Sequence, residues 1–191
     1  MKKYNLAILG ATGAVGQEML KVLEERNFPV NELKLLASKR SAGTFMEFKG
    51  KKYEIEEAKE TSFENIHVVL CAAENDISKK LSPAAVKAGA VVIDNSSAYR
   101  LDDDVPLVVP EVNGEDVKKH KGIIANPNCS TTIAVTAINE LNKYSKIKRM
   151  IVTTFQAVSG AGVNGIRELD KQIKDISEGK EVEIKTFSYQ I

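Results

Sequence analysis

Hydrophobic residues recur along the chain in short runs that alternate with stretches of helical periodicity. Runs rich in apolar residues, typical of buried strands, occupy residues 4–9, 32–37, 66–71 and 90–94. Apolar positions at helical spacing predict helices between them, over residues 14–26 and 76–88. Strands that alternate with helices favour a parallel sheet covered on both faces. Right-handed crossovers then give an α/β fold with a doubly wound parallel sheet.

The pattern changes after residue 128. A hairpin over residues 44–56 and a strand at 122–125 complete the first part of the chain. The later residues predict two helices separated by a long strand at 150–157, and then an alternating strand at 181–186. We therefore divide the chain into residues 1–128 and the start of a second, α+β domain at 129–191. The last strand runs to an apolar end without a partner, so we expect the chain to stop inside that second domain.

Composition and charge exclude several classes of protein. The 191 residues carry 27 Lys+Arg and 26 Asp+Glu, a formal charge of +1, and 43% of them are hydrophobic. This is the composition of a globular protein, and it gives no electrostatic case for nucleic acid or a membrane surface. No apolar run approaches the roughly 18 residues of a membrane span, and the start has no secretory signal, so we expect a cytoplasmic protein. Two distant cysteines, Cys71 and Cys129, predict neither a disulfide scaffold nor a metal site.

A glycine-rich loop joins the first strand to the first helix, in the sequence Gly10-Ala11-Thr12-Gly13-Ala14-Val15-Gly16. Glycines there allow a tight turn and bring backbone N–H groups close to a pyrophosphate at the helix N-terminus. The spacing is Gly-x-x-Gly-x-x-Gly, and the alternative is a plain strand-to-helix turn. The strand before the loop and the helix after it favour a dinucleotide site, so residues 1–128 are predicted to be a dinucleotide-binding domain.

The end of the second predicted strand bears on the choice of cofactor. NAD sites usually have a carboxylate there for the ribose hydroxyls. Here the residues are Ser38, Lys39, Arg40 and Ser41, which suit a 2′-phosphate and favour NADP. A solvated basic turn is the alternative.

Cys129 follows an Asn-Pro-Asn segment and precedes an apolar helix. At the first turn of a helix, the dipole and the free N–H groups stabilise a thiolate. The alternative is a small structural cysteine, which is our prediction for Cys71 in its apolar strand. A nicotinamide site together with a nucleophilic Cys129 suggests aldehyde-level oxidoreduction through a thioester.

Five motifs together resemble the aspartate-semialdehyde dehydrogenase family, in order and spacing along nearly the whole chain. They are the glycine loop, residues 94–100 (DNSSAYR), 109–113 (VPEVN), 126–131 (NPNCST) and 156–162 (QAVSGAG). The resemblance implies a Rossmann-type NADP-binding domain followed by the start of a catalytic and dimerisation domain. It implies reductive dephosphorylation of aspartyl β-phosphate by NADPH, a step in lysine, threonine and methionine biosynthesis. It also implies a homodimer or homotetramer for the full-length protein.

The resemblance also implies roles for single residues. Cys129 corresponds to the nucleophile and Gln156 to a substrate-orienting glutamine, while Asn95 and Arg100 correspond to the group that binds phosphate. Gly10 and Ser38 are candidate cofactor contacts from the glycine loop and the end of the second strand. The resemblance implies further cofactor contacts at Thr12, Gly13, Ala14, Val15, Arg40, Ser41, Ser159 and Gly160. Taken alone, Arg100 beside Asp102–Asp104 would suit a surface ion pair, and the Ser159–Gly160 segment a simple turn.

Two departures from the family pattern matter. Residues 73–76 (AEND) stand where the family often has glycines. The family's general-base histidine and further substrate-binding residues lie beyond the stretch that this chain matches, and neither His67 nor His120 is placed to replace them. We therefore expect the isolated chain to be inactive. The alternatives are N-acetyl-γ-glutamyl-phosphate reductase, which usually has Asn-Pro-Gly-Cys at the nucleophile, and a non-catalytic nucleotide-binding fragment.

Overall fold

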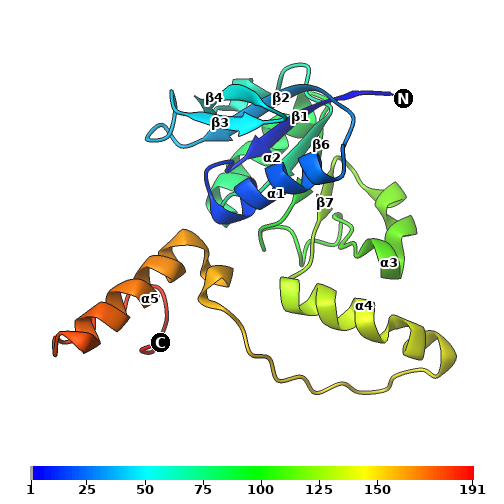
Figure 1. The fold of residues 1–191 in the computed structure, drawn as a ribbon. Helices are drawn as coiled ribbons and strands as arrows, with labels where there is room; N and C mark the ends of the chain where they lie inside the picture. The colour runs from blue at the N-terminus through cyan, green and yellow to red at the C-terminus, as the bar shows by residue number, and fades with distance from the viewer. Residues whose placement is uncertain (1) are drawn as a thin grey trace. The chain divides into compact units, whose positions relative to one another are not determined.

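The computed structural model describes residues 2–191, which form two compact units divided between Met150 and Ile151. The first unit is built on a seven-stranded sheet in the order β3-β4-β2-β1-β5-β6-β7 (Figure 1). The six strands other than β3 run parallel, and β3 pairs antiparallel with β4 at one edge. The strands are β1 Tyr4–Leu9, β2 Val30–Ala37, β3 Phe45–Phe48, β4 Lys51–Glu57, β5 Val68–Cys71, β6 Val91–Asp94 and β7 Ile123–Ala125.

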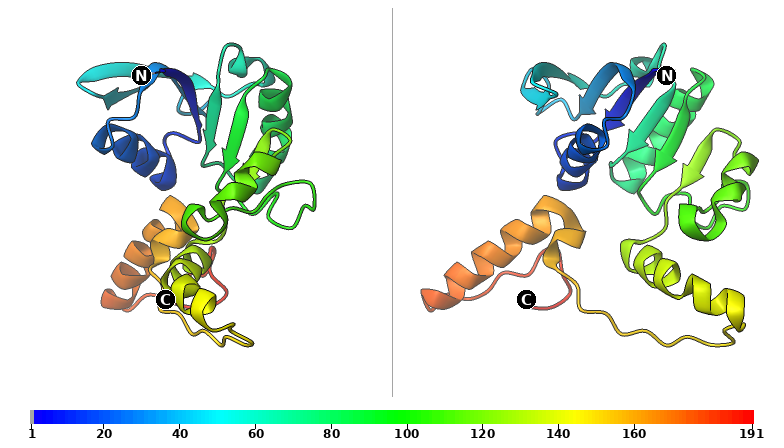
Figure 2. Two further views of the ribbon diagram at one scale, coloured as in Figure 1. Left: turned by 90° about the vertical axis from the view of Figure 1, so that its right-hand side faces the viewer. Right: turned by 45° about the vertical axis from the view of Figure 1, so that its right-hand side comes forward.

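Helices cover both faces of this sheet, as Figure 2 shows for α1 and α2. On one face α1 packs Leu20 and Leu23 into a buried cluster with strand residues such as Ile8. On the other face α2 packs Leu81 and Ala85 against residues of β5 and β6. The helices of this unit are α1 Ala14–Glu25, α2 Asn75–Lys87, α3 Pro110–Asn113 and α4 Cys129–Tyr144, with the 3-10 helices η1 Glu60–Phe63 and η2 Gly114–Lys119.

The sequence pattern predicted these elements because their apolar side chains pack locally on the sheet. The four buried strands, the hairpin and both crossover helices form within a few residues of the predicted limits. Helix α2 runs unbroken through Pro83. The predicted fold class, a doubly wound sheet followed by a further region, is confirmed.

The second unit consists of the 3-10 helix η3 (Val158–Ala161) and α5 (Gly162–Ser177), followed by a segment without regular structure. The strands predicted at 150–157 and 181–186 are wrong for this structure, because neither stretch is paired with another strand in the described chain. An extended backbone becomes a strand only when a neighbour takes up its N–H and C=O groups. In the second stretch these groups turn instead to α5, where the Glu168 carboxylate accepts from the N–H of Lys185 at 3.0 Å.

Candidate functional site

The glycine loop has the open backbone that a pyrophosphate requires. Gly10 has φ +87°, and a Cβ atom at that position would lie 2.6 Å from the Ala72 carbonyl oxygen. A Cβ on Gly16 would lie 2.3 Å from the Gly10 oxygen, so both positions need glycine. Gly13 caps α1 without any side chain, and the first turn holds no acidic residue. The first N–H groups of the helix therefore stay available to an anion.

The end of β2 lies beside this loop. The Leu36 carbonyl accepts from the N–H of Gly10 at 2.8 Å and from that of Ala11 at 3.1 Å. The next residues, 38–41, form a tight turn in which the Ser41 N–H donates to the Ser38 carbonyl at 2.9 Å. Lys39 and Arg40 project from this turn into solvent. Hydroxyls and cations thus stand where a ribose would extend from the glycine loop.

A carboxylate that the sequence analysis missed lies one strand further out. Glu57 ends β4 opposite Ala37, the last residue of β2. Lys59 pairs with it at 2.9 Å and, together with the charge of Lys39, holds the pKa of Glu57 below its ordinary value. Glu57 is far from the glycine loop in sequence, and only the order of the strands brings it here.

Asn95 and Arg100, both proposed to bind phosphate, lie in one cluster with Asn126. The Arg100 Nε donates to the Asn126 carbonyl at 2.9 Å, and its Nη2 donates to the Asn95 carbonyl at 3.0 Å. The Asn126 amide donates to the side-chain oxygen of Asn95. Arg100 forms none of the ion pairs recorded for residues 2–191; Asp104 pairs instead with Lys121. The guanidinium therefore clamps the turn after β6 to the turn after β7.

Asn75 fills part of the stretch where the family often has glycines. As the first residue of α2, it accepts from the Ser97 N–H at 3.0 Å, and its Nδ2 donates to the Ser97 hydroxyl at 2.9 Å. This side chain therefore helps to hold the 95–100 turn. Asn75 and Asn126 lie in segments named from the sequence, but their contacts were not predicted, because their partners are 22 and 31 residues away.

Cys129 is the first residue of α4, and its side chain is exposed. Asn128 caps the helix by accepting from the Ser130 N–H at 3.0 Å. The thiol therefore stands in solvent at the positive end of a 16-residue helix, three residues after the clamped Asn126. Cys71 is the opposite case, since it is fully buried and burial raises its pKa to about 11. Only one of the two cysteines is accessible as a nucleophile.

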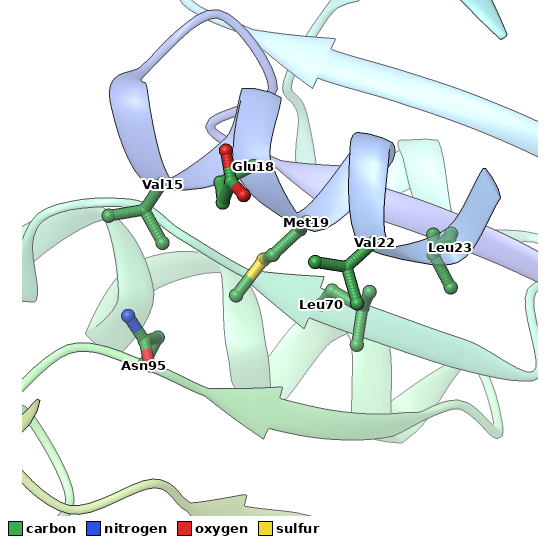
Figure 3. A pocket seen from close by; sticks show the side chains of 7 residues that line it. All are labelled: Val15, Glu18, Met19, Val22, Leu23, Leu70 and Asn95. Carbon is green, nitrogen blue, oxygen red and sulfur yellow. The ribbon is translucent and has the colours of Figure 1, made fainter. Parts of the chain in front are cut away.

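An apolar pocket of about 320 Å³ connects the glycine-loop helix with the 95–100 turn. In Figure 3, Met19 and Val22 of α1 face Leu70 of β5, while Val15 and Asn95 lie at the same end of the pocket. The start of α1 and the Asn95 turn are therefore neighbours. This pocket is an open apolar groove along the side of α1, and Asn95 contributes a polar group at one end.

Gln156, Ser159 and Gly160 lie in the second unit. The Gln156 side-chain oxygen accepts from the Thr154 hydroxyl at 3.0 Å, and its side chain is exposed. Ser159 and Gly160 belong to η3, just before α5. The glycine loop, Asn95 and Arg100 lie together in the first unit. Gln156, Ser159 and Gly160 belong to the second unit.

Comparison with known families decides the affiliation of the chain. A family model described as "Semialdehyde dehydrogenase, NAD binding domain" matches residues 5–120, and one described as "Semialdehyde dehydrogenase, dimerisation domain" matches residues 139–191. The chain belongs to the semialdehyde dehydrogenase family. Its glycine loop lies in the first matched range, and Gln156 in the second. Cys129 falls between the two.

Curated relatives of this semialdehyde dehydrogenase chain are longer than it is. The aspartate-semialdehyde dehydrogenase of Aquifex aeolicus is 55% identical, over 98% of this chain and 56% of the relative. That of Bacillus subtilis is 51% identical, over 94% and 52%. The chain thus spans about half the length of the curated relatives it matches. The resemblance drawn from the five motifs is confirmed.

Solved structures of the family share the fold. Aspartate semialdehyde dehydrogenase II from Vibrio cholerae, complexed with ASA, superposes with a TM-score of 0.96 at 47% identity, covering 100% of this chain and 57% of that one. Aspartate semialdehyde dehydrogenase with NADP from Candida albicans gives a TM-score of 0.65 at 29% identity, covering 75% and 48%. No helix within residues 2–191 is both long and apolar enough to cross a bilayer.

Proposed function

We propose that this chain carries the nucleotide site and the nucleophile of an NADP-dependent aspartate-semialdehyde dehydrogenase. The observation that carries the proposal is the exposed Cys129 at the start of α4, three residues after Asn126, which forms a hydrogen-bonded cluster with Asn95 and Arg100. A thiol in this position suits attack on an acyl phosphate. The relatives named above, and the solved Candida albicans structure with NADP, support the same activity.

The residues present fit a dinucleotide. The helix N-terminus after Gly13 would hold the pyrophosphate, while Ser38, Arg40 and Ser41 would hold a 2′-phosphate. Thr12, Ala14 and Val15 are the remaining proposed contacts in the first unit. We propose Ser159 and Gly160 of the second unit as further contacts, on the strength of the family motif. The choice of NADP over NAD rests on the basic turn at 38–41.

The chemistry falls to Cys129. Its thiolate attacks the acyl carbon of aspartyl β-phosphate, phosphate leaves with the electrons of the broken C–O bond, and a thioester remains. A bound reduced nicotinamide would supply the hydride that takes this thioester to the aldehyde level. The resulting thiohemiacetal collapses, which returns the thiolate and releases aspartate semialdehyde. Gln156 is proposed to orient the substrate, and Arg100 with Asn95 to bind its phosphate.

The remaining expectations stand as part of the proposal. They are a domain boundary between residues 128 and 129, a homodimer or homotetramer, and work in the cytoplasm on lysine, threonine and methionine synthesis. The dimerisation-domain match supports oligomerisation. The main alternative is N-acetyl-γ-glutamyl-phosphate reductase, and a nucleotide-binding fragment without catalysis is the other.

The first half-reaction tests the proposal on the 191-residue chain itself. We expect aspartyl β-phosphate to add one aspartyl group to the peptide that contains Cys129, detected by mass spectrometry after tryptic digestion. Cys129→Ala is expected to take up no acyl group while it still binds NADPH. An adduct on another residue of the unaltered chain, or its persistence in the variant, would refute the assigned nucleophile. Acylation by N-acetyl-γ-glutamyl phosphate alone would favour the alternative.

A further inference from the structure

Asp94 is a buried carboxylate for which the proposed mechanism has no use. It ends β6 and is fully buried, yet it forms none of the ion pairs recorded for the described residues. Its Oδ1 accepts from the Ser78 hydroxyl at 3.0 Å and from the Ser96 N–H at 3.2 Å, and its Oδ2 accepts from the Ser96 hydroxyl at 2.7 Å. A charge is kept in an apolar core only when hydrogen bonds satisfy it in this way.

These hydrogen bonds order the turn that follows β6. The Ser96 oxygen that donates to Asp94 also accepts from the Ala98 N–H at 3.1 Å. One carboxylate therefore fixes successive residues of the 95–100 turn through a single hydroxyl. Short side-chain links of this kind are what set the conformation of such turns.

The ordered 95–100 turn also holds the segment that leads to Cys129. Arg100, at its end, donates to the Asn126 carbonyl at 2.9 Å. The Asn126 N–H donates to the Asp94 carbonyl at 2.8 Å, so the same strand end anchors the segment a second time. Hydrogen bonds therefore link Asp94 to Ser96 at the start of the turn and Arg100 at its end to Asn126, three positions before the thiol. The backbone of the turn joins these two sets of bonds.

We propose that Asp94 and Ser96 are a positioning pair, which fixes the Arg100 guanidinium beside the Cys129 turn so that an anionic group is favoured there. The pair acts through Arg100 and touches neither substrate nor thiol. This inference rests on the proposed function for the role of Cys129. It adds a pair of side chains beneath the 95–100 turn that sets the position of the Arg100 guanidinium.

Two alkylating agents of nearly the same size separate positioning from folding. Iodoacetate is an anion and iodoacetamide is neutral, so the ratio of their rates at Cys129 reports the local positive potential. Cys71 serves as an internal control, since it is buried and its pKa of about 11 keeps it unreactive until the chain unfolds. The measurement needs neither cofactor nor turnover, so its outcome is independent of the acylation experiment.

The decisive variant is Ser96→Ala, and its matched control is Ser82→Ala. Ser82 belongs to the same buried cluster, with its hydroxyl 3.1 Å from that of Ser78. It meets the 95–100 turn at the Tyr99 side chain, whereas the hydrogen bonds of the Asp94 carboxylate go to Ser78 and Ser96. Displacing one cation near the surface is worth a rate factor of about three or more, so we expect Ser96→Ala to lower the iodoacetate/iodoacetamide ratio by about threefold. Ser82→Ala is expected to keep the ratio of the unaltered chain, and so is Ser96→Thr, which retains the hydroxyl.

An unchanged ratio in Ser96→Ala, or an equal fall in Ser82→Ala, would overturn the proposal. If Ser96→Ala also labels rapidly at Cys71 it is unfolded, and Asp94→Asn is measured in its place. Asparagine presents one accepting oxygen where the carboxylate presents two, so hydrogen bonds to the 95–100 turn are lost and a fall in the ratio is expected. Loss of the Asp94 charge alone would instead raise the ratio, so the direction of the change separates the two effects. A ratio that stays unchanged in a folded Asp94→Asn variant would then refute the pair.

Discussion

At the scale of single residues, a side chain can stabilise the backbone in addition to the binding role that its chemistry suggests. Arg100 suits a phosphate by its planar fork, yet two of its nitrogens are already engaged with backbone carbonyls at 2.9 and 3.0 Å. A guanidinium has five N–H donors, so it can hold the backbone and still offer a donor to an anion. Substitution of Arg100 is therefore expected to disturb the Asn126 turn as well as anion binding.

The basic turn at the end of β2 gives a prediction about cofactor choice. Arg40→Gln is expected to weaken NADPH binding roughly tenfold and to leave NADH binding unchanged, because only NADPH carries the 2′-phosphate. Fluorescence titration of both nucleotides measures this. The matched control is Arg26→Gln, at the other end of α1, which should alter neither affinity. Equal weakening of both nucleotides by Arg40→Gln would show that Arg40 does not read the 2′-phosphate.

At the scale of elements, pairing decides whether an extended segment becomes a strand. The predicted strand at 181–186 has the right alternation, but α5 takes up its backbone in place of a neighbouring strand. The Glu168 carboxylate accepts from the N–H groups of Lys185 and Thr186 and from the amide of Gln172. These backbone donors stabilise the charged form and lower the pKa of Glu168 from 4.5 to about 2.

This depressed pKa predicts a pH dependence for the packing of the segment on α5. A carboxylate whose pKa is lowered by folding contributes stability above its ordinary value of 4.5 and loses it as the pH falls toward about 2. We expect the amide NMR resonances of Lys185 and Thr186 to titrate together with a midpoint near 2. Glu168→Gln should abolish this titration.

The matched control removes a carboxylate at the end of the same helix. Glu178 pairs with Lys180 and does not touch the segment at 183–187. Glu178→Gln should therefore leave both amide titrations in place. A midpoint near 4.5 in the unaltered chain would contradict the inferred hydrogen bonds.

At the scale of the molecule, the two compact units are joined by a stretch without regular structure. Helix α4 ends at Tyr144, and η3 begins at Val158. The residues between them include exposed apolar side chains such as Ile151 and Phe155, which are 79% and 102% exposed. The domain boundary predicted at 128/129 lies before α4, whereas the division into compact units falls after it, at 150/151.

Limited proteolysis tests this junction. Trypsin requires an extended, accessible backbone, so we expect the first cuts at Lys146, Lys148 and Arg149. Mass spectrometry of the early products identifies the sites. Replacing these three residues by Gln should delay the first cleavage. First cuts within the seven-stranded sheet, or protection of the junction, would show that residues 146–157 are covered in solution.

The sequence alone determined the elements whose apolar side chains pack on their immediate neighbours. The buried strands, the crossover helices and the glycine turn follow from local patterns, because periodicity and glycine placement act within a few residues. The same pattern placed Cys129 at a helix start, which the structure confirms. The family motifs supplied Asn95 and Arg100 as further residues of the site.

Only the tertiary structure decided which distant side chains meet. Asn126 bonds to Asn95, Asn75 to Ser97 and Ser78 to Asp94, across separations of 31, 22 and 16 residues. These contacts depend on the order in which parallel strands lie side by side, and no local pattern encodes that order. The extended segments at 150–157 and 181–186 make the same point, since a strand exists only where a second strand meets its backbone.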